Sequence, residues 1–335
     1  MPAMRESVQP LGAHMVRRLP TKAELAERTS LVLTERDKEI LSAVHTQGFL
    51  TTDLIELAFF PPPAGGRRTH SSRAYDRLRQ LWLWSYLERV ELPVSRTLGG
   101  RQPFLYTLGR RGVPVVTAHL GPDAGPVHCR RLDRLDNVFV EHDLIVATLW
   151  ANLKALIRST QVPGLRWTPE RELRACHARV KDPEKGRWIP FLPDAHIEID
   201  NPDDTVQCYL VEVDMGTLTL ARFRRKLRAF ETYLAQGLFE RNWDRSVFDV
   251  MVLTNSRSRL QHLWQAARSE VPEERWDWYL FATFEILQPR KFGGQAYLTL
   301  GGEQTGLLDD DAFEEKRGDD AGVSLPIRVG RAAGV

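Results

Sequence analysis

Two short segments of the chain place acidic side chains where they could hold a divalent cation. Asp194 follows Pro193 at the start of one predicted strand, and Glu212 and Asp214 lie in the next. If these strands form a β-hairpin, Asp194 and Glu212 meet at neighbouring strand ends, and strand alternation puts Glu212 and Asp214 on one face. Carboxylate oxygens are the ligands that Mg²⁺ and Mn²⁺ prefer. We therefore expect all three carboxylates to be metal ligands, at a site where Mg²⁺ or Mn²⁺ activates water and stabilises a phosphoryl transition state.

Each of these carboxylates also has a structural interpretation. Pro-Asp dipeptides are common in turns, so Asp194 by itself is weak evidence for a functional site. Glu212 and Asp214 are stronger evidence, because two like charges on one strand face repel each other unless a cation or a basic side chain lies between them.

The first third of the chain predicts a separate function. Thr34 is a candidate N-cap for a first helix, and Thr51 or Thr52 caps a second one. A third helix is predicted over 71–82, followed by strands over 86–92 and 104–108. Three helices and a two-stranded hairpin in this order are typical of a winged helix–turn–helix, whose third helix enters the major groove of DNA.

Basic residues gather on these elements. Helical spacing places Arg73, Arg77 and Gln80 on a common face of the third helix, and further basic residues precede that helix or lie at the hairpin tip. Such side chains are placed for contacts with DNA phosphates. The candidate DNA-binding residues are Arg67, Arg68, His70, Arg73, Arg77, Gln80, Arg96 and Arg101. The structural alternative is that these side chains only face solvent, and winged helices also serve as protein-interaction modules.

The rest of the chain predicts an α/β layered domain. Strands are expected at 167–176, 194–199, 207–213, 247–253 and 278–287, and helices at 135–157, 217–234 and 257–268. The strand over 247–253 is expected to run parallel to 207–213 through a right-handed crossover. The predicted fold class is α/β, or α+β overall. The predicted organisation is a flexible basic arm (1–30), a DNA-binding domain (31–120), a linker (121–130), a second domain (131–290) and a disordered acidic tail (305–335).

Composition narrows the class of protein without identifying a partner. The 335 residues carry a net charge of only +2, so the basic character is local, around 67–111, rather than global. Three widely spaced cysteines do not have zinc-ligand spacing and indicate a reducing, cytoplasmic location. No apolar run is long enough to span a bilayer, so we expect no membrane association. The phosphate-binding loop of an ATPase is absent as well.

The order of elements around Pro193-Asp194 and Glu212-Val213-Asp214 resembles the PD-(D/E)xK nuclease superfamily. With the preceding winged helix and the phrase Glu212-Val213-Asp214-Met215-Gly216-Thr217, residues 31–287 are similar to the replication-relaxation family of plasmid and mobile-element proteins. The resemblance implies a restriction-endonuclease-like domain with a mixed central sheet. It also implies a lysine and a tyrosine in the following helix, which Lys226 and Tyr233 match. A helical acid before the sheet is implied too, and Glu141 matches it, with His142 as a weaker candidate.

The chain departs from the superfamily at its third motif residue. That residue is a lysine, whose ammonium group orients the attacking water and offsets developing charge, whereas this chain has Asp214. Either Lys226 reaches back into the site, or Asp214 acts as a metal ligand or general base. If neither holds, the domain is a catalytically inactive platform. The predicted catalytic set is Asp194, Glu212, Asp214, Lys226 and Glu141.

Together these patterns lead to a functional hypothesis and an alternative. The hypothesis is a DNA-binding protein of plasmid or mobile-element replication or relaxation, with Mg²⁺-dependent phosphodiester cleavage. The alternative is a catalytically inactive replication or transcription factor that uses the second domain for assembly. The expected partners are double-stranded DNA, a second copy of the chain in a homodimer, and replication or mobilisation proteins.

Overall fold

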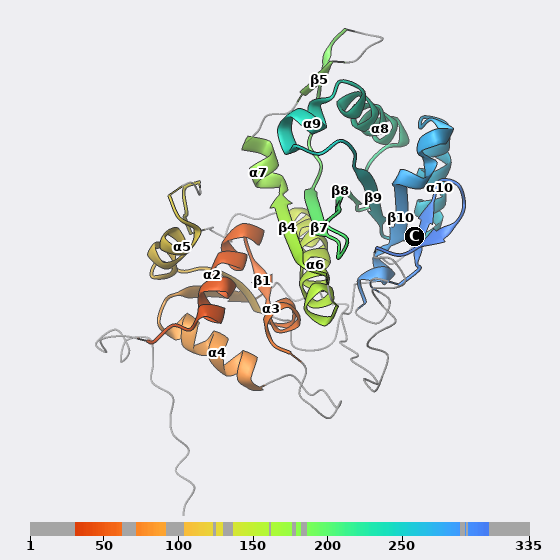
Figure 1. Cartoon of the computed structure of the whole chain (residues 1–335). Helices are drawn as coiled ribbons and strands as arrows, with labels where there is room; N and C mark the ends of the chain where they lie inside the picture. The colour runs from red at the N-terminus through yellow and green to blue at the C-terminus, as the bar shows by residue number, and fades with distance from the viewer. Residues whose placement is uncertain are drawn as a thin grey trace, which may run out of the picture.

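The computed structural model describes residues 31–61, 72–91, 104–122, 125–129, 137–160, 162–175, 179–181, 186–288, 292 and 294–307. The predicted basic arm and nearly all of the predicted acidic tail lie outside these residues. The predicted fold class is confirmed, because helices surround a large mixed sheet (Figure 1). None of the described helices is long and apolar enough to cross a membrane.

The N-terminal region contains the predicted helices and hairpin. Its helices are α2 (Glu35–Gln47), α3 (Thr52–Phe59), α4 (Ser72–Leu83) and α5 (Gly112–Leu120). Its strands are β1 (Leu50–Thr51), β2 (Leu87–Glu91) and β3 (Phe104–Leu108), which form an antiparallel sheet in the order β1-β3-β2. Helix α2 begins with a capping box, in which the Thr34 hydroxyl accepts from the Asp37 amide and the Asp37 carboxylate accepts from the Thr34 amide. Thr51 caps α3 through the amide of Leu54.

The larger region is built on a seven-stranded sheet in the order β12-β11-β10-β9-β8-β7-β4. Its strands are β4 (Gly164–Pro169), β7 (Ala195–Asp200), β8 (Val206–Asp214), β9 (Asp249–Thr254), β10 (Tyr279–Thr283), β11 (Tyr297–Thr299) and β12 (Gln304–Thr305). Strands β8, β9 and β10 are mutually parallel, as expected for the crossover from β8 to β9, and the other pairs are antiparallel. A separate two-stranded hairpin comprises β5 (Arg179–Lys181) and β6 (Trp188–Pro190).

Helices cover both faces of this sheet. Helix α6 (Asn137–Ser159) packs on one face, where its Leu149 and Leu153 share a core with Tyr209 and Val211 of β8. Helices α8 (Leu220–Ala235) and α10 (Arg257–Arg268) pack on the other face. The remaining helical segments are α7 (Glu170–Ala175), α9 (Leu238–Trp243), η1 (Glu273–Trp278) and η2 (Phe284–Leu287). The alternation of β8 therefore sends odd-numbered side chains toward α6 and even-numbered ones toward α8.

Helix α6 also joins the two regions. Its Trp150 and Ala151 belong to the core of the N-terminal region, while Leu149 and Leu153 belong to the core of the sheet. At its C-terminal end, the Arg158 guanidinium donates to the carbonyls of Ala58 (2.6 Å) and Leu57 (3.0 Å) in α3. These contacts pack the N-terminal region directly against the sheet domain.

Three sequence expectations are corrected by the structure. The strand predicted over 167–176 is β4 followed by α7, because Pro169 ends the strand and Glu170 and Glu172 suit the first turn of a helix. The strand predicted over 278–287 ends at Thr283 and continues as η2. The sheet also extends beyond β10 through β11 and β12, so residues 305–307, the start of the predicted tail, are instead part of the fold.

Candidate functional site

The predicted pairing of the two acidic segments brings Asp194 beside the end of β8. Strand β7 starts at Ala195, which lies opposite Val211 in the antiparallel register. The Asp194 amide donates to the Val211 carbonyl (2.8 Å), and the Val213 amide donates to Asp194 Oδ2 (2.7 Å). The Asp194 side chain is thereby held against the β8 segment that carries Glu212.

Glu212 lies in a buried environment with one oxygen occupied and one free of protein partners. Its side chain is 3% exposed, and Oε1 accepts from the ammonium group of Lys226, which reaches down from α8. Its second oxygen, Oε2, is buried without a hydrogen-bond partner. Burial and the neighbouring Asp194 charge raise the pKa of Glu212 to about 8, against the opposing influence of Lys226.

Lys226 stays protonated in this cluster. Burial lowers the pKa of its ammonium group, but the adjacent carboxylates of Glu212 and Asp194 outweigh burial and raise the pKa above its ordinary value. Lys226 thus reaches back from α8 to the predicted carboxylate Glu212. Tyr233, two turns further along α8, instead lies in the core, where its ring stacks on Phe191 at 3.9 Å.

His142 of α6 completes the cluster. Its Nε2 lies 3.3 Å from Asp194 Oδ2, and Nδ1 lies 3.6 Å from Asp143 Oδ1. Burial opposes protonation, but the two carboxylates raise the pKa of His142 to about 10. Glu141, the preferred helical candidate in the sequence, is exposed. Both residues are at helical spacing from Ile145 and Leu149 of the buried α6 stripe, so the rotation of α6 about its axis decides which of them faces Asp194.

Asp214 is not brought into this cluster, although it shares a strand face with Glu212. Its two oxygens accept from Arg259 of α10, Nε to Oδ2 at 2.7 Å and a terminal nitrogen to Oδ1 at 3.2 Å. The Thr254 hydroxyl also donates to Oδ2 at 3.1 Å. With its side chain fully buried and both oxygens bound, Asp214 is a poor metal ligand or general base.

Of the three predicted metal ligands, Asp194 and Glu212 lie in the cluster, whereas both oxygens of Asp214 are bound to other side chains. Among the described residues, no three or more His, Cys, Asp and Glu side chains are arranged to hold a metal ion. Mg²⁺ is usually bound through one or two carboxylates, with water and substrate phosphates completing its shell. Asp194 and Glu212 meet that requirement, and the buried Glu212 Oε2 is an acceptor that the protein leaves without a donor.

The predicted DNA-binding residues separate into three groups. Arg73 is exposed on α4. Arg77 is instead bound within the protein: it donates to both oxygens of the buried Asp37 (2.8 and 2.5 Å) and to the Val32 carbonyl (2.9 Å). Gln80 is exposed, and its Oε1 accepts from Arg77 at 2.8 Å. The contacts of Arg77 with Asp37 and Val32 tie α4 to the start of α2, and a DNA contact of Arg77 or Gln80 stays a prediction. The others, Arg67, Arg68, His70, Arg96 and Arg101, lie outside the described residues.

Basic side chains also surround Lys226 on α8. Arg222 and Arg225 are exposed, and helical spacing places Arg222, four residues before Lys226, on the same side as Lys226. Arg224 and Arg228 are instead directed to Glu270, at 3.6 and 2.7 Å. Arg222 therefore adds a positive charge on the side of α8 from which Lys226 extends to Glu212.

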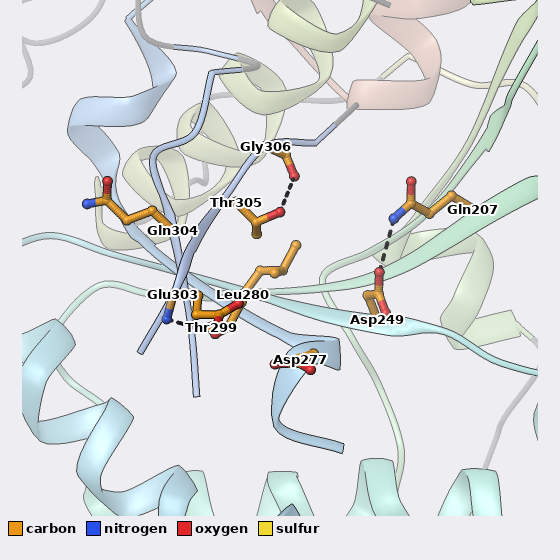
Figure 2. Close-up of a pocket in the computed structure, with 9 residues that line it drawn as sticks. All are labelled: Gln207, Asp249, Asp277, Leu280, Thr299, Glu303, Gln304, Thr305 and Gly306. Atoms are coloured by element: carbon orange, nitrogen blue, oxygen red, sulfur yellow. Dashed lines mark hydrogen bonds between the residues drawn. The ribbon is translucent and has the colours of Figure 1, made fainter. Parts of the chain in front are cut away.

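A pocket at the opposite end of the sheet is separate from this cluster. Gln207 and Asp249 lie near the starts of β8 and β9, whereas Glu212 lies near the end of β8. Figure 2 shows the pocket, lined by Gln207, Asp249, Asp277, Leu280, Thr299, Glu303, Gln304, Thr305 and Gly306. Two of its polar side chains bond to each other, since Gln207 Nε2 donates to Asp249 Oδ2 at 3.2 Å.

Comparison with known proteins gives one match. A family model described as replication-relaxation matches residues 41–247, more than half of the chain, and this span contains every residue of the Asp194 cluster. Neither the curated proteins nor the solved structures contain a match to the chain.

Proposed function

The chain belongs to the replication-relaxation family, and from this premise we propose that it binds DNA of a plasmid or other mobile element and hydrolyses phosphodiester bonds with Mg²⁺ or Mn²⁺. The observation that carries the catalytic part is the Asp194–Glu212–Lys226 cluster. It combines two adjacent carboxylates, a carboxylate oxygen without a protein donor and a charged lysine.

Each residue of the cluster has a defined part in this proposal. Asp194 and Glu212 would hold the cation, which when bound supplies water activation and charge neutralisation at the phosphate. Lys226, held by Glu212, would take over the work of the motif lysine by orienting the attacking water and offsetting charge on the phosphoryl oxygens. His142 and the Val213 amide fix the orientation of Asp194.

The DNA-binding part rests on the N-terminal region. Its helices α2, α3 and α4 and the antiparallel β2–β3 pair follow one another in the order of a winged helix–turn–helix, in which α4 would enter the major groove. Arg73 is the exposed basic residue of that helix for which we propose a DNA contact. Arg222 and Arg225 would contact phosphates on either side of the bond that is cut.

A cleavage assay tests the catalytic proposal. The wild type is expected to nick or linearise supercoiled DNA with Mg²⁺ or Mn²⁺, and the Asp194→Ala, Glu212→Ala double variant is expected to lose that activity while keeping its fold. Glu240→Ala, which removes an exposed carboxylate of α9, is the matched control. Cleavage that persists in the double variant would refute the assignment.

A binding assay tests the DNA-binding proposal separately. Arg73→Ala is expected to weaken DNA binding and to lower the slope of log K against log salt concentration by about 1, the value for one lost phosphate contact. Unchanged affinity and slope would contradict a role for α4 in contacting DNA.

One observation favours the catalytically inactive alternative. The place of the motif lysine is held by Asp214, which is neutralised by Arg259 and cannot replace an ammonium group. Calorimetric titration with Mn²⁺ distinguishes the two functions. An assembly factor is expected to bind DNA without binding Mn²⁺, whereas the proposed nuclease binds Mn²⁺ through Asp194 and Glu212.

A further inference from the structure

The β5–β6 hairpin has one face inside the protein and one face in solvent. Val180 and Ile189, the central residues of its strands, are buried in the core that also contains Phe223 and Leu227 of α8. The Lys181 carbonyl accepts from Gln236 Nε2 at 3.1 Å. The hairpin is therefore anchored to α8, and Figure 1 shows it at one extremity of the molecule, beyond α8 and α9.

The outer face of the hairpin carries an unusual combination of side chains. Arg179 and Lys181 of β5 and Trp188 of β6 are all exposed, and Lys181 lies directly opposite Trp188 in the register. Arg187, next to Trp188, is exposed too. Among the described residues, no carboxylate lies within ion-pair distance of these three cations.

Trp188 is exceptional among the tryptophans of the chain. All nine lie in the described part of the structure, and Trp188 alone is mostly exposed, at 62%. Its indole ring is held on a short ribbon between cationic neighbours rather than on a loose loop. An indole has one hydrogen-bond donor and no acceptor, so it is unsuited to reading base edges but well suited to stacking.

The hairpin leads directly into the candidate site. Trp188 precedes Asp194 by six residues, a distance of at most about 20 Å along the chain. The intervening Phe191 stacks on Tyr233, which follows Lys226 by about 10 Å along α8. A nucleic-acid strand lying on the hairpin would therefore be only a few nucleotides from the carboxylates.

From these observations we propose that the outer face of the β5–β6 hairpin binds single-stranded DNA next to the site, with Trp188 stacking on an unpaired base and Arg179, Lys181 and Arg187 contacting phosphates. The inference rests on the proposed function in that it takes DNA as the substrate. It adds a preference for a locally unpaired strand. Positive charge and an exposed aromatic surface together are the features of sequence-tolerant single-strand binding.

Fluorescence anisotropy with a labelled single-stranded oligonucleotide, and with the duplex of the same sequence, tests this inference. Trp188→Ala is expected to weaken single-strand binding about 5- to 150-fold, the range for loss of one base–aromatic stack, and to leave duplex binding nearly unchanged. Trp188→Phe is expected to recover most of the affinity. Val247→Ala, which shortens an apolar side chain that is 50% exposed, is the matched control.

A second variant separates charge from stacking. Arg179→Ala with Lys181→Ala is expected to lower the salt slope of single-strand binding by about 1.4, the value for two phosphate contacts. Unfolding midpoints equal to that of the wild type would show that the variants are folded, as expected for exposed positions.

Three outcomes would overturn the inference while leaving the proposed function standing. One is single-strand affinity of Trp188→Ala within twofold of the wild type. Another is an equal loss on duplex and single strand, which would indicate a groove contact. The third is a Trp188→Ala variant that no longer self-associates in sedimentation but still binds DNA like the wild type. That result would make the outer face of the hairpin an interface between copies of the chain. If the wild type binds neither form of DNA, the proposed function itself fails.

Discussion

Glu212 and Asp214 are two acids on one face of β8, separated by one residue, and their surroundings are opposite in kind. Asp214 is gripped by Arg259 through two hydrogen bonds and by Thr254 through a third, so neither of its oxygens is available. Glu212 shares one oxygen with Lys226 and keeps the other without a donor. Arginine and lysine differ here as their geometries predict, since a planar fork occupies both carboxylate oxygens and an ammonium group occupies one.

This difference separates an acid with a structural role from the acid that we propose as a metal ligand. The Asp214–Arg259 pair ties the end of β8 to α10, and the same side chain of Arg259 also donates to the Leu218 carbonyl ahead of α8. The Glu212–Lys226 pair instead leaves a polar oxygen in a poorly solvated place, which costs stability unless a ligand uses it. Proximity along a strand therefore does not imply a shared role.

The largest effect is expected from breaking the structural pair. Arg259→Ala leaves the fully buried Asp214 carboxylate with only Thr254, so the free energy of unfolding should fall by about 3–5 kcal/mol. Urea denaturation measures this change. Arg257→Ala is the control, because Arg257 is 88% exposed and its ion pair with Glu285 is long, at 3.8 Å. Its loss should lower the free energy of unfolding by about 0–1 kcal/mol. Equal losses in the two variants would contradict the structural role of Asp214.

A similar pair in the N-terminal region should behave in the same way. Arg77→Ala leaves the buried Asp37 carboxylate without its arginine partner and is expected to lower the free energy of unfolding by about 3 kcal/mol. Burial opposes ionisation of Asp37, but the hydrogen bonds from Arg77 and Thr34 outweigh burial and lower its pKa. The ion pair therefore stabilises the wild-type fold above the ordinary pKa of aspartate, and this stabilisation is lost as the pH falls through the lowered pKa. The stability difference between Arg77→Ala and the wild type should thus shrink in acid.

The same variant separates the structural assignment of Arg77 from a DNA contact. At a pH and temperature where Arg77→Ala stays folded, its DNA affinity should match that of the wild type, unlike the affinity of Arg73→Ala. A reduced salt slope in folded Arg77→Ala would restore Arg77 to the DNA-binding surface.

The sequence predicts a contact well when the two residues lie close together along the chain, and poorly when they lie far apart. Caps, helices and the β7–β8 hairpin are specified by neighbours a few residues apart, so Thr34, Thr51 and the register that brings Asp194 beside β8 were accessible. Lys226 was named from the family resemblance, and it can reach Glu212 because α8 follows β8 directly and packs on the sheet face to which Glu212 points.

The partners of Asp214 and Arg77 could not be predicted in this way. Arg259 follows Asp214 by 45 residues and Arg77 follows Asp37 by 40, and no periodic pattern records which distant arginine a buried acid selects. The choice between Glu141 and His142 depended on the rotation of α6 about its axis, which is set by its packing against both cores.

Glu212, the acid that we propose as a metal ligand, is expected to show a smaller effect, and its replacement should stabilise the fold rather than destabilise it. Burial and Asp194 raise the pKa of Glu212 from 4.5 to about 8, so the folded state holds its proton more tightly than the unfolded chain. Wild-type stability should therefore decrease as the pH rises from about 4.5 to 8. Glu212→Gln removes this dependence and should be more stable than the wild type by about 1 kcal/mol or more near pH 8, while losing metal-dependent cleavage. Destabilisation as large as that of Arg259→Ala would make Glu212 a structural acid as well.

The smallest effect is expected at Asp249, a partly buried acid at the other end of the same sheet. Burial raises its pKa to about 6, while the hydrogen bond from Gln207 and the charge of Arg275 act in the opposite direction. A raised acid pKa again means that stability is lost as the pH rises, here between the ordinary aspartate value and about 6. Asp249→Asn keeps an oxygen for Gln207 Nε2, so it should increase stability at pH 7 by up to about 1 kcal/mol and flatten the pH dependence below pH 6.

Cleavage by Asp249→Asn should be unchanged, because the pocket of Figure 2 lies at the start of β8 and β9 and Glu212 lies near the end of β8. If Asp249→Asn abolished cleavage as Glu212→Gln should, the chemistry would extend along the whole strand, and the contrast between the acids of β8 would no longer locate the site.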